Sequence, residues 1–248
     1  MRGWLFWALV PVLLQEDEAA RAAIQGWRHP WAGFRAGSRL VINETTRRSH
    51  FDLERKQTVF RDQWTQYVWT VRSATPEAVV VRMEGGGKES EIPIPLAPPG
   101  IFRGRGQAKG GENLDVGGRI YRCAVFTISL DMDRDAGQRT TIWRCPEAPV
   151  WAVRILSETF AGGKRNTWEE ERLVETGKNL EIEGREVSCH VFEVTTESEG
   201  GGRTVNREWR CEAIPGGVAR RETRLYEGGR ENEGAYRKME VVSFEARR

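Results

Sequence analysis

One pattern occurs twice in the chain: Gly118-Arg-Ile-Tyr-Arg-Cys-Ala-Val-Phe126 recurs 66 residues later as Gly184-Arg-Glu-Val-Ser-Cys-His-Val-Phe192. Each copy continues into a second stretch that ends in Trp-Arg-Cys, at residues 143–145 and 209–211. The second copy then carries two additional glycines. Because cysteine, valine, phenylalanine and tryptophan all agree at a single offset, we conclude that the chain contains a duplicated structural unit.

Each copy is predicted to fold back on itself as an antiparallel hairpin. If Cys123 lies opposite Cys145, the turn falls within the Asp- and Gly-containing run 131–137, and Val125 faces Trp143. The equivalent register in the second copy centres the turn on residues 200–201. Opposite charges then become cross-strand neighbours, which supports this register. The pairs predicted in the second copy are Val191 with Trp209, Glu193 with Arg207, and Glu197 with Arg203.

The four cysteines are predicted to form two disulfides within the hairpins, Cys123–Cys145 and Cys189–Cys211. Residues directly opposite each other on antiparallel strands lie within disulfide range. Each bond closes a similar loop and is expected to contribute about 3 kcal/mol. Four free buried thiols are the alternative, and a zinc site is less consistent because no C-x-x-C spacing occurs. A tryptophan two residues before each second cysteine is expected to pack over its disulfide, with ligand stacking as the alternative.

The first 15 residues indicate export. Arg2 precedes an apolar run from Trp4 to Leu14, and acidic residues follow at 16–18. A short basic start with about ten apolar residues is typical of a secretory signal peptide. A membrane anchor would need about 20 apolar residues, and a buried helix fits the aromatic run and following acids poorly. We therefore expect a periplasmic or extracellular protein with no transmembrane span in its mature chain.

Residues 16–27 favour a helix that ends before Pro30, with acids in its first turn and an alanine-rich stripe. An aromatic segment, residues 31–34, then resembles a latch onto a sheet. Because alanines fill little volume, we expect an apolar pocket between this helix and the sheet, with Trp27, Trp31 and Phe34 near its rim.

The remaining chain reads as strands and turns, with strands expected at residues 38–44, 58–71 and 78–83. The Ile-Pro-Ile-Pro run at residues 92–95 must be extended and cannot belong to a central strand. We divide the chain into a signal peptide (1–15), a helix and aromatic latch (16–34), an N-terminal β unit (35–103), a flexible loop (104–117) and two β repeats (118–178 and 179–246).

Composition and motifs argue against several classes of function. The 248 residues include 38 Lys and Arg against 36 Asp and Glu, so nothing indicates a nucleic-acid partner or an anionic membrane as the main one. No nucleophile, phosphate-loop or metalloprotease motif occurs, and we expect no enzyme activity, cofactor or catalytic metal. Asp131, Asp133 and Asp135 resemble the start of a calcium loop, but Ala136 replaces its glycine and Ile142 its final glutamate. Whether this turn binds calcium stays open.

The repeated G-x-x-Y-x-C-x-V-F…W-x-C-P-E-x-P unit resembles segments of secreted bacterial proteins with a lipoprotein-localisation-factor (LolA-like) half-barrel. This resemblance covers roughly residues 31–244 as an order of strands and transfers no lipid-contacting residue. It implies a curved antiparallel sheet with one N-terminal helix and an apolar concave face. We therefore predict an all-β fold of that kind, containing a duplicated β-hairpin unit.

Two functions follow from this prediction. The first is an exported, non-catalytic protein that binds an acyl chain, lipid or other apolar ligand on the concave face. The second is a structural or interaction module of the cell envelope that binds a protein partner and no small ligand. The sequence does not separate them.

Overall fold

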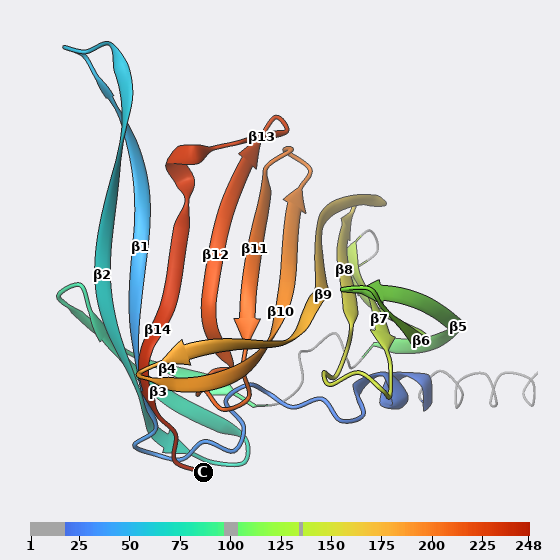
Figure 1. The fold of residues 1–248 in the computed structure, drawn as a ribbon. Coiled ribbons are helices and arrows are strands. Elements are labelled where there is room, and N and C mark those ends of the chain that lie inside the picture. The colour runs from blue at the N-terminus through green and yellow to red at the C-terminus, as the bar shows by residue number, and fades with distance from the viewer. Residues whose placement is uncertain (1–17, 97–103, 134–135) are drawn as a thin grey trace, which may run out of the picture. The chain divides into compact units, whose positions relative to one another are not determined.

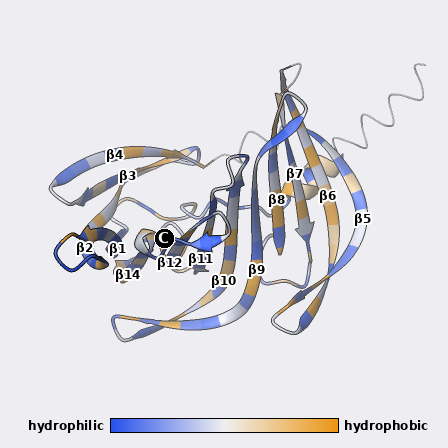
Figure 2. Ribbon diagram, turned by 90° about the horizontal axis from the view of Figure 1, so that it is seen from above, coloured by the Kyte–Doolittle hydropathy of each residue, from blue (hydrophilic) through white to orange (hydrophobic). Residues whose placement is uncertain are grey.

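The computed structural model describes residues 18–96, 104–133 and 136–248. The predicted signal peptide and the centre of the 131–137 turn lie outside these ranges. The described residues form 14 antiparallel strands and a short helix at residues 18–24, which confirms the predicted all-β class with one N-terminal helix. Polar and apolar residues alternate along many strands, as expected for sheets with two different faces (Figure 2).

The strands have the following bounds: β1 Arg39–Asp52, β2 Gln57–Ala74, β3 Ala78–Gly85, β4 Lys88–Pro95, β5 Arg105–Val116, β6 Arg119–Asp133, β7 Ala136–Arg144, β8 Arg154–Ala161, β9 Lys164–Ile182, β10 Arg185–Ser198, β11 Arg203–Arg210, β12 Val218–Glu227, β13 Arg230–Glu231 and β14 Arg237–Glu245. A short 3-10 helix, η2, spans Glu233–Ala235.

The strand order is β4-β3-β2-β1-β14-β12-β11-β10-β9-β8-β7-β6-β5, with β13 paired to β12. The strands curve strongly (Figure 1), and β-bulges interrupt several ladders, including those between β1 and β14 and between β5 and β6. Such bulges bend strands and increase their twist. Strand β4 lies at an edge of the sheet, where the absent N–H groups of Pro93 and Pro95 cost no central ladder bond.

The duplicated hairpins are β6–β7 and β10–β11, and both predicted registers are confirmed. Val125 pairs with Trp143 in the first hairpin, and Val191 pairs with Trp209 in the second. Glu193 also lies opposite Arg207, and Glu197 opposite Arg203, as the predicted register requires. The second turn runs from Ser198 to Gly202, closed by hydrogen bonds between the backbones of these residues.

Contacts divide the chain into two compact units, each containing one hairpin. Among the described residues, unit 1 comprises residues 18–27, 104–133 and 136–173, and unit 2 comprises residues 28–96 and 174–248. Strand β9 belongs to unit 1 up to Leu173 and to unit 2 from Val174.

The helix at residues 18–24 packs on hairpin β6–β7 within unit 1. Ala23 is fully buried among Ile128, Ile142 and Ala152. Gly106 of β5 allows the helix to approach, because a Cβ at this glycine would lie 2.2 Å from the backbone nitrogen of Ala20.

The core of unit 2 includes the second disulfide. Trp31 is buried there and stacks on Trp69 of β2, with ring centroids 6.3 Å apart. Trp31 of the predicted latch thus packs against β2. It docks on the two glycines that only the second copy has: a Cβ at Gly216 would lie 2.7 Å from the Trp31 ring, and one at Gly217 2.9 Å from Pro30.

The prediction of a flexible loop at residues 104–117 was wrong. Residues 105–116 form β5, which pairs along its length with β6. Its glycines had indicated a loop, but Gly106 serves the close approach of the helix, and Gly110 follows a bulge with a φ of 105°. In β5 these two glycines are therefore explained by a close contact and by a bulge, and they do not indicate a flexible segment.

Candidate interaction surface

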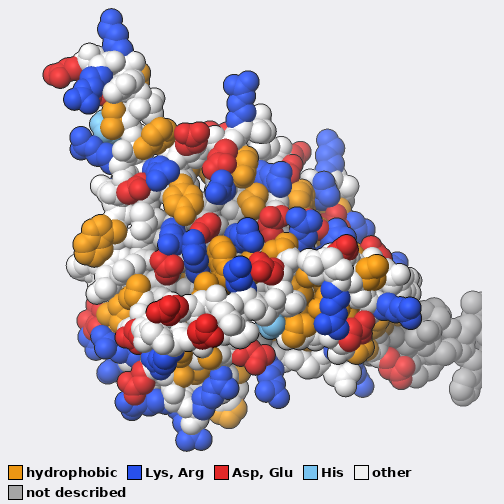
Figure 3. All heavy atoms as spheres, viewed as in Figure 1, with side chains coloured by type: hydrophobic (Ala, Val, Ile, Leu, Met, Phe, Trp, Pro, Cys, Tyr) orange, Lys and Arg blue, Asp and Glu red, His pale blue; other side chains and the backbone are white. Residues whose placement is uncertain are grey.

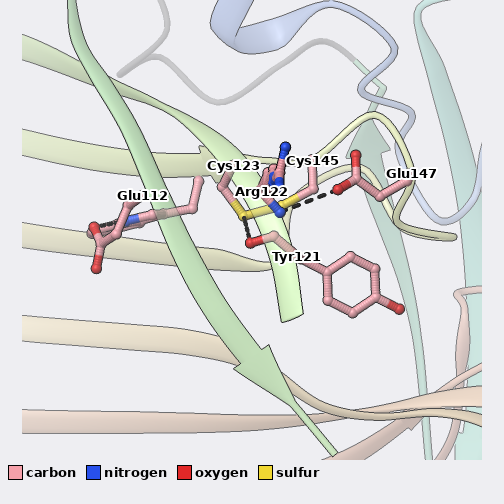
Figure 4. Close-up of a disulfide and its surroundings, with 7 residues drawn as sticks. Glu112, Tyr121, Arg122, Cys123, Cys145 and Glu147 are labelled. Atoms are coloured by element: carbon pink, nitrogen blue, oxygen red, sulfur yellow. Dashed lines mark hydrogen bonds between the residues drawn. A yellow bond between two sulfur atoms is a disulfide. The ribbon is translucent and has the colours of Figure 1, made fainter. Parts of the chain in front are cut away.

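The four predicted disulfide cysteines are paired as expected. Cys123 bonds to Cys145 and Cys189 to Cys211, each across 22 positions of sequence. In Figure 4 the first disulfide lies near Glu147, whose carboxylate accepts a 3.1 Å hydrogen bond from the backbone N–H of Arg122. Hydrogen bonds from backbone N–H groups, its own first and that of Arg122 second, lower the pKa of Glu147. All four cysteines are buried, so the disulfides are structural elements of the two hairpins.

The three residues predicted to line an apolar pocket are divided between the two units. Trp27 belongs to unit 1, whereas Trp31 and Phe34 belong to unit 2. Trp31 and Phe34 are only 6% and 4% exposed, so these two rings fill the protein interior. The apolar pocket beside the helix stays a prediction.

A shallow groove of about 420 Å³ lies in unit 2 near the start of β10. Five of its lining residues are polar or charged: Arg185, Glu186, Ser188, His190 and Glu212. The remaining lining residues are Val187, Ala213 and Phe244, and the Arg185 guanidinium stacks over the Phe244 ring at 4.8 Å. The lining therefore combines charged groups with apolar surface.

The surface that stands out is the outer part of the β1–β2 hairpin, residues 47–64, which we call the arm. Strand β1 pairs with β14 only as far as Thr46, and β2 pairs with β3 only from Tyr67 onward. Within the arm, β1 and β2 therefore pair only with each other among the described strands, and the ribbon projects beyond β14 (Figure 1). Arg47 anchors its base, because its N–H donates to the carbonyl of Tyr236 and its guanidinium lies over the Tyr236 ring.

One face of the arm carries three exposed aromatic side chains. Residues opposite each other on paired strands share a face, and so do residues two apart. Phe60 lies opposite Ser49, and Trp64 lies opposite Thr45, which places both rings on the face of Phe51. These rings are 58% exposed at Phe51, 43% at Phe60 and 74% at Trp64. The Arg47–Asp62 ion pair lies between Phe60 and Trp64 on this face. Several exposed large apolar side chains on one face indicate an interaction surface more than a single one does.

The other face of the arm is cationic. Arg48 lies directly opposite Arg61, and His50 lies on the same face opposite Val59. Neither arginine has a carboxylate partner in the described part of the chain, and both are exposed. Like charges directly opposite each other destabilise a strand pair, so this arrangement favours a bound anion.

The acidic side chains of the arm's middle and tip are engaged within the arm. Arg47 donates two hydrogen bonds to Asp62, at 2.8 and 3.1 Å, which lower the pKa of Asp62 and raise that of Arg47. Asp52 caps the turn by accepting from the backbone N–H groups of Glu54 and Arg55, both at 3.0 Å. Leu53, which is 81% exposed, forms the tip. Figure 3 shows basic and apolar side chains gathered on this projecting ribbon, at upper left.

Metal binding finds no support in the described ranges. Within them, no three histidine, cysteine, aspartate or glutamate side chains gather as a metal site. Asp135 of the proposed calcium turn lies outside the described residues, and the side chain of Asp133 is not described. Nor does any described helix have the length and apolarity needed to cross a bilayer.

Comparison with known proteins adds no relative: no protein-family model, curated protein or solved structure matches the chain. Inference about function therefore rests on the chain's own residues.

Sequence reasoning missed the arm, although the sequence contained a signal for it. The aromatic residues of β2 change parity, from Phe60 and Trp64 at even positions to Tyr67 and Trp69 at odd positions. Since alternate residues of a strand point to opposite faces, only one of the two pairs can face the core. Tyr67 and Trp69 pack against the core of unit 2, and Phe60 and Trp64 are exposed.

Proposed function

We propose that this chain is an exported, non-catalytic interaction module of the cell envelope that contacts its partner through the arm. The observation that carries the proposal is the free two-stranded ribbon, with Phe51, Phe60 and Trp64 exposed on one face. A two-stranded ribbon is at best marginally stable by itself. Exposed aromatic rings on such a ribbon gain most when a partner covers them.

Export is supported by two features. The two disulfides are compatible with a compartment outside the reducing cytoplasm. The first 15 residues have the basic and apolar pattern of a signal peptide. Together they favour the periplasm or the cell exterior, where an envelope partner is accessible.

The apolar-ligand hypothesis predicts a different outcome in a simple measurement. A carrier of acyl chains would retain a co-purified lipid in native mass spectrometry and bind a fluorescent fatty acid saturably at micromolar concentration. The groove on unit 2 combines charged residues with Val187, Ala213 and Phe244, and no observation singles it out as a site for an acyl chain. We therefore expect the mass of the protein alone.

The arm proposal can be tested by removing the arm. Residues 48–61 are replaced with Asn-Gly, which joins the paired residues Arg47 and Asp62 by a two-residue turn suited to antiparallel strands. Both forms are exported in a bacterial host, and their distribution between the envelope and soluble fractions is measured. We expect the full chain in the envelope fraction and the trimmed chain in the soluble fraction.

The matched control is Ile120→Ser, since Ile120 is 66% exposed and lies outside the arm. Unchanged thermal unfolding and intact disulfides establish that the trimmed chain is folded. Equal distribution of the full and trimmed chains would refute the arm as the contact surface.

A further inference from the structure

We infer that the partner of the arm is an anionic lipid surface, an inference that rests on the proposed function. The arm is an amphipathic ribbon, with Phe51, Phe60 and Trp64 on one face and the Arg48–Arg61 pair on the other. Amphipathic helices with aromatic residues on one face and basic residues on the other lie in the plane of a membrane interface, and the arm divides its side chains in the same way. Tryptophan in particular favours the level of the lipid headgroups.

The charge balance of the arm favours an anionic partner. It contains five Lys and Arg against three Asp and Glu, whereas the complete chain is nearly neutral. Two of the three acids are engaged within the arm, Asp62 by Arg47 and Asp52 by the turn backbone. Arg48, Arg61 and Lys56 remain exposed to solvent. Lipid phosphates would relieve the repulsion between Arg48 and Arg61 that folding of the arm creates.

The extended shape of the arm suits a lipid bilayer as its partner. Each arm strand extends about 20 Å or more beyond the ladders of β14 and β3, at roughly 3.3 Å per residue. Phe51 and Phe60 stand along a ribbon that has no other strand beside it, and Trp64 lies on β2 before its ladder with β3 begins. A bilayer can cover them without shape complementarity. A second copy of the chain is less favoured at the cationic face, since paired arms would bring four arginines together.

The inference is tested with the complete mature protein and large unilamellar vesicles. Vesicles of equal parts phosphatidylglycerol and phosphatidylcholine are compared with vesicles of phosphatidylcholine alone, by co-sedimentation. We expect binding to the anionic vesicles that weakens in 0.5 M salt, because salt screens exposed charges. Quenching by brominated lipid should be smaller in Trp64→Phe, because Trp64 is on the face that enters the interface.

Two arm variants separate the contributions of charge and apolar contact. Arg48→Glu with Arg61→Glu should weaken binding to anionic vesicles by about 30-fold or more, since each basic side chain near such a surface contributes roughly fivefold. Phe60→Ser with Trp64→Ser should weaken it by about tenfold or more. The control for charge is Lys88→Glu with Lys164→Glu, and the control for apolarity is Ile120→Ser. Both controls should bind as the unchanged protein does.

The outcomes distinguish this inference from the proposed function. If the full chain does not bind anionic vesicles but still needs its arm to enter the envelope fraction, the lipid inference fails and a protein partner is indicated. If the arm variants bind like their controls, lipid binding does not occur through the arm, and the inference also fails. If light scattering shows arm-dependent dimers with no vesicle binding, a second copy is the partner, and a lipid surface is excluded.

Discussion

The two copies of the hairpin share their disulfide and register, but they are covered in different ways on the face opposite that of the cysteines. In unit 1, Ile142 of β7 is fully buried beneath the helix, with Ala23 in the same cluster. The equivalent residue of β11 is Glu208, which is 5% exposed. Its carboxylate accepts from Arg210 at 2.7 Å and from Arg221 at 2.6 Å.

Arginines at equivalent positions of the two copies, Arg144 and Arg210, take part in these two arrangements. Arg144 donates a hydrogen bond to the carbonyl of Ala22 in the helix. Its counterpart Arg210 lies over the ring of Phe192 at 4.4 Å and pairs with Glu208. One hairpin thus supports an apolar contact with a helix, and the other supports a network of charged side chains. The two copies thus share the disulfide and the strand register that duplication gave them. They differ in what packs on the face opposite that of the cysteines.

The largest expected effect comes from exchanging the side chains at the equivalent positions 142 and 208. Ile142→Glu places a carboxylate under the helix, opposite Ile155 where Glu208 has Arg221, and Arg144 is already bonded to the helix. We expect it to lower the free energy of unfolding by about 4 kcal/mol. Glu208→Ile removes the buried carboxylate but leaves Arg210 and Arg221, whose side chains are 31% and 44% exposed and therefore reach water. We expect a smaller loss, about 1–2 kcal/mol. Urea denaturation with hydrogen exchange measures both. If both substitutions lowered the free energy of unfolding equally, the distinction between an apolar contact in unit 1 and a charged network in unit 2 would be wrong.

Removal of the disulfides compares the hairpins themselves. Cys123→Ala with Cys145→Ala, and Cys189→Ala with Cys211→Ala, open loops of equal length. Each pair should lose about 3 kcal/mol in urea denaturation, because the loop entropy of the unfolded chain is the same. A difference of more than about 1 kcal/mol would show that surrounding packing dominates. Peptide mapping without reduction should yield Cys123–Cys145 and Cys189–Cys211 and no cross-repeat pair.

Two glycines allow the covering segments to approach. Gly106→Ala places a Cβ against the backbone of Ala20 and should cost about 2 kcal/mol, with faster hydrogen exchange in hairpin β6–β7. Gly216→Ala meets the Trp31 ring and also has a φ of 80°, so its cost should be similar or larger, with faster exchange in unit 2. Gly118→Ala is the control, since its φ is 85° and no atom lies within 4 Å of the added Cβ. Losses no larger than that of the control would contradict the close contacts.

The smallest expected effect is a loss of stability as the pH falls. All three histidines belong to unit 2, and burial lowers the pKa of His29 and of His190, with Glu212 partly opposing the shift at His190. The unfolded chain therefore binds more protons, and unit 2 should lose stability as the pH falls below the ordinary value of 6.5. In unit 1, Glu147 has a lowered pKa and loses its contribution only below 4.5. Hydrogen exchange at pH 7.5 and 5.5 should change in unit 2 first, and His190→Gln should reduce that change.

The features that could be predicted from the sequence are those set by neighbours along a hairpin. The positions of the four cysteines and the charges at Glu193 and Arg207 defined two registers, and both are present. The latch at Trp31 was also predictable, since an aromatic cluster after a helix needs a surface to pack on. The loop expected around Gly106 was wrong, because a glycine that serves a close contact looks the same in sequence as one in a flexible loop.

The sequence by itself determined the repeat, the hairpins, the disulfides and the all-β class, because each depends on residue spacing and on alternation along paired strands. Only the tertiary structure decided which hairpin lies beneath the helix and which lies beneath charged side chains. It also decided where β14 and β3 stop pairing with the β1–β2 hairpin, and therefore which aromatic rings remain exposed on the arm. The physical reason is that burial depends on segments distant in the chain, whereas spacing and alternation are properties of the strand itself.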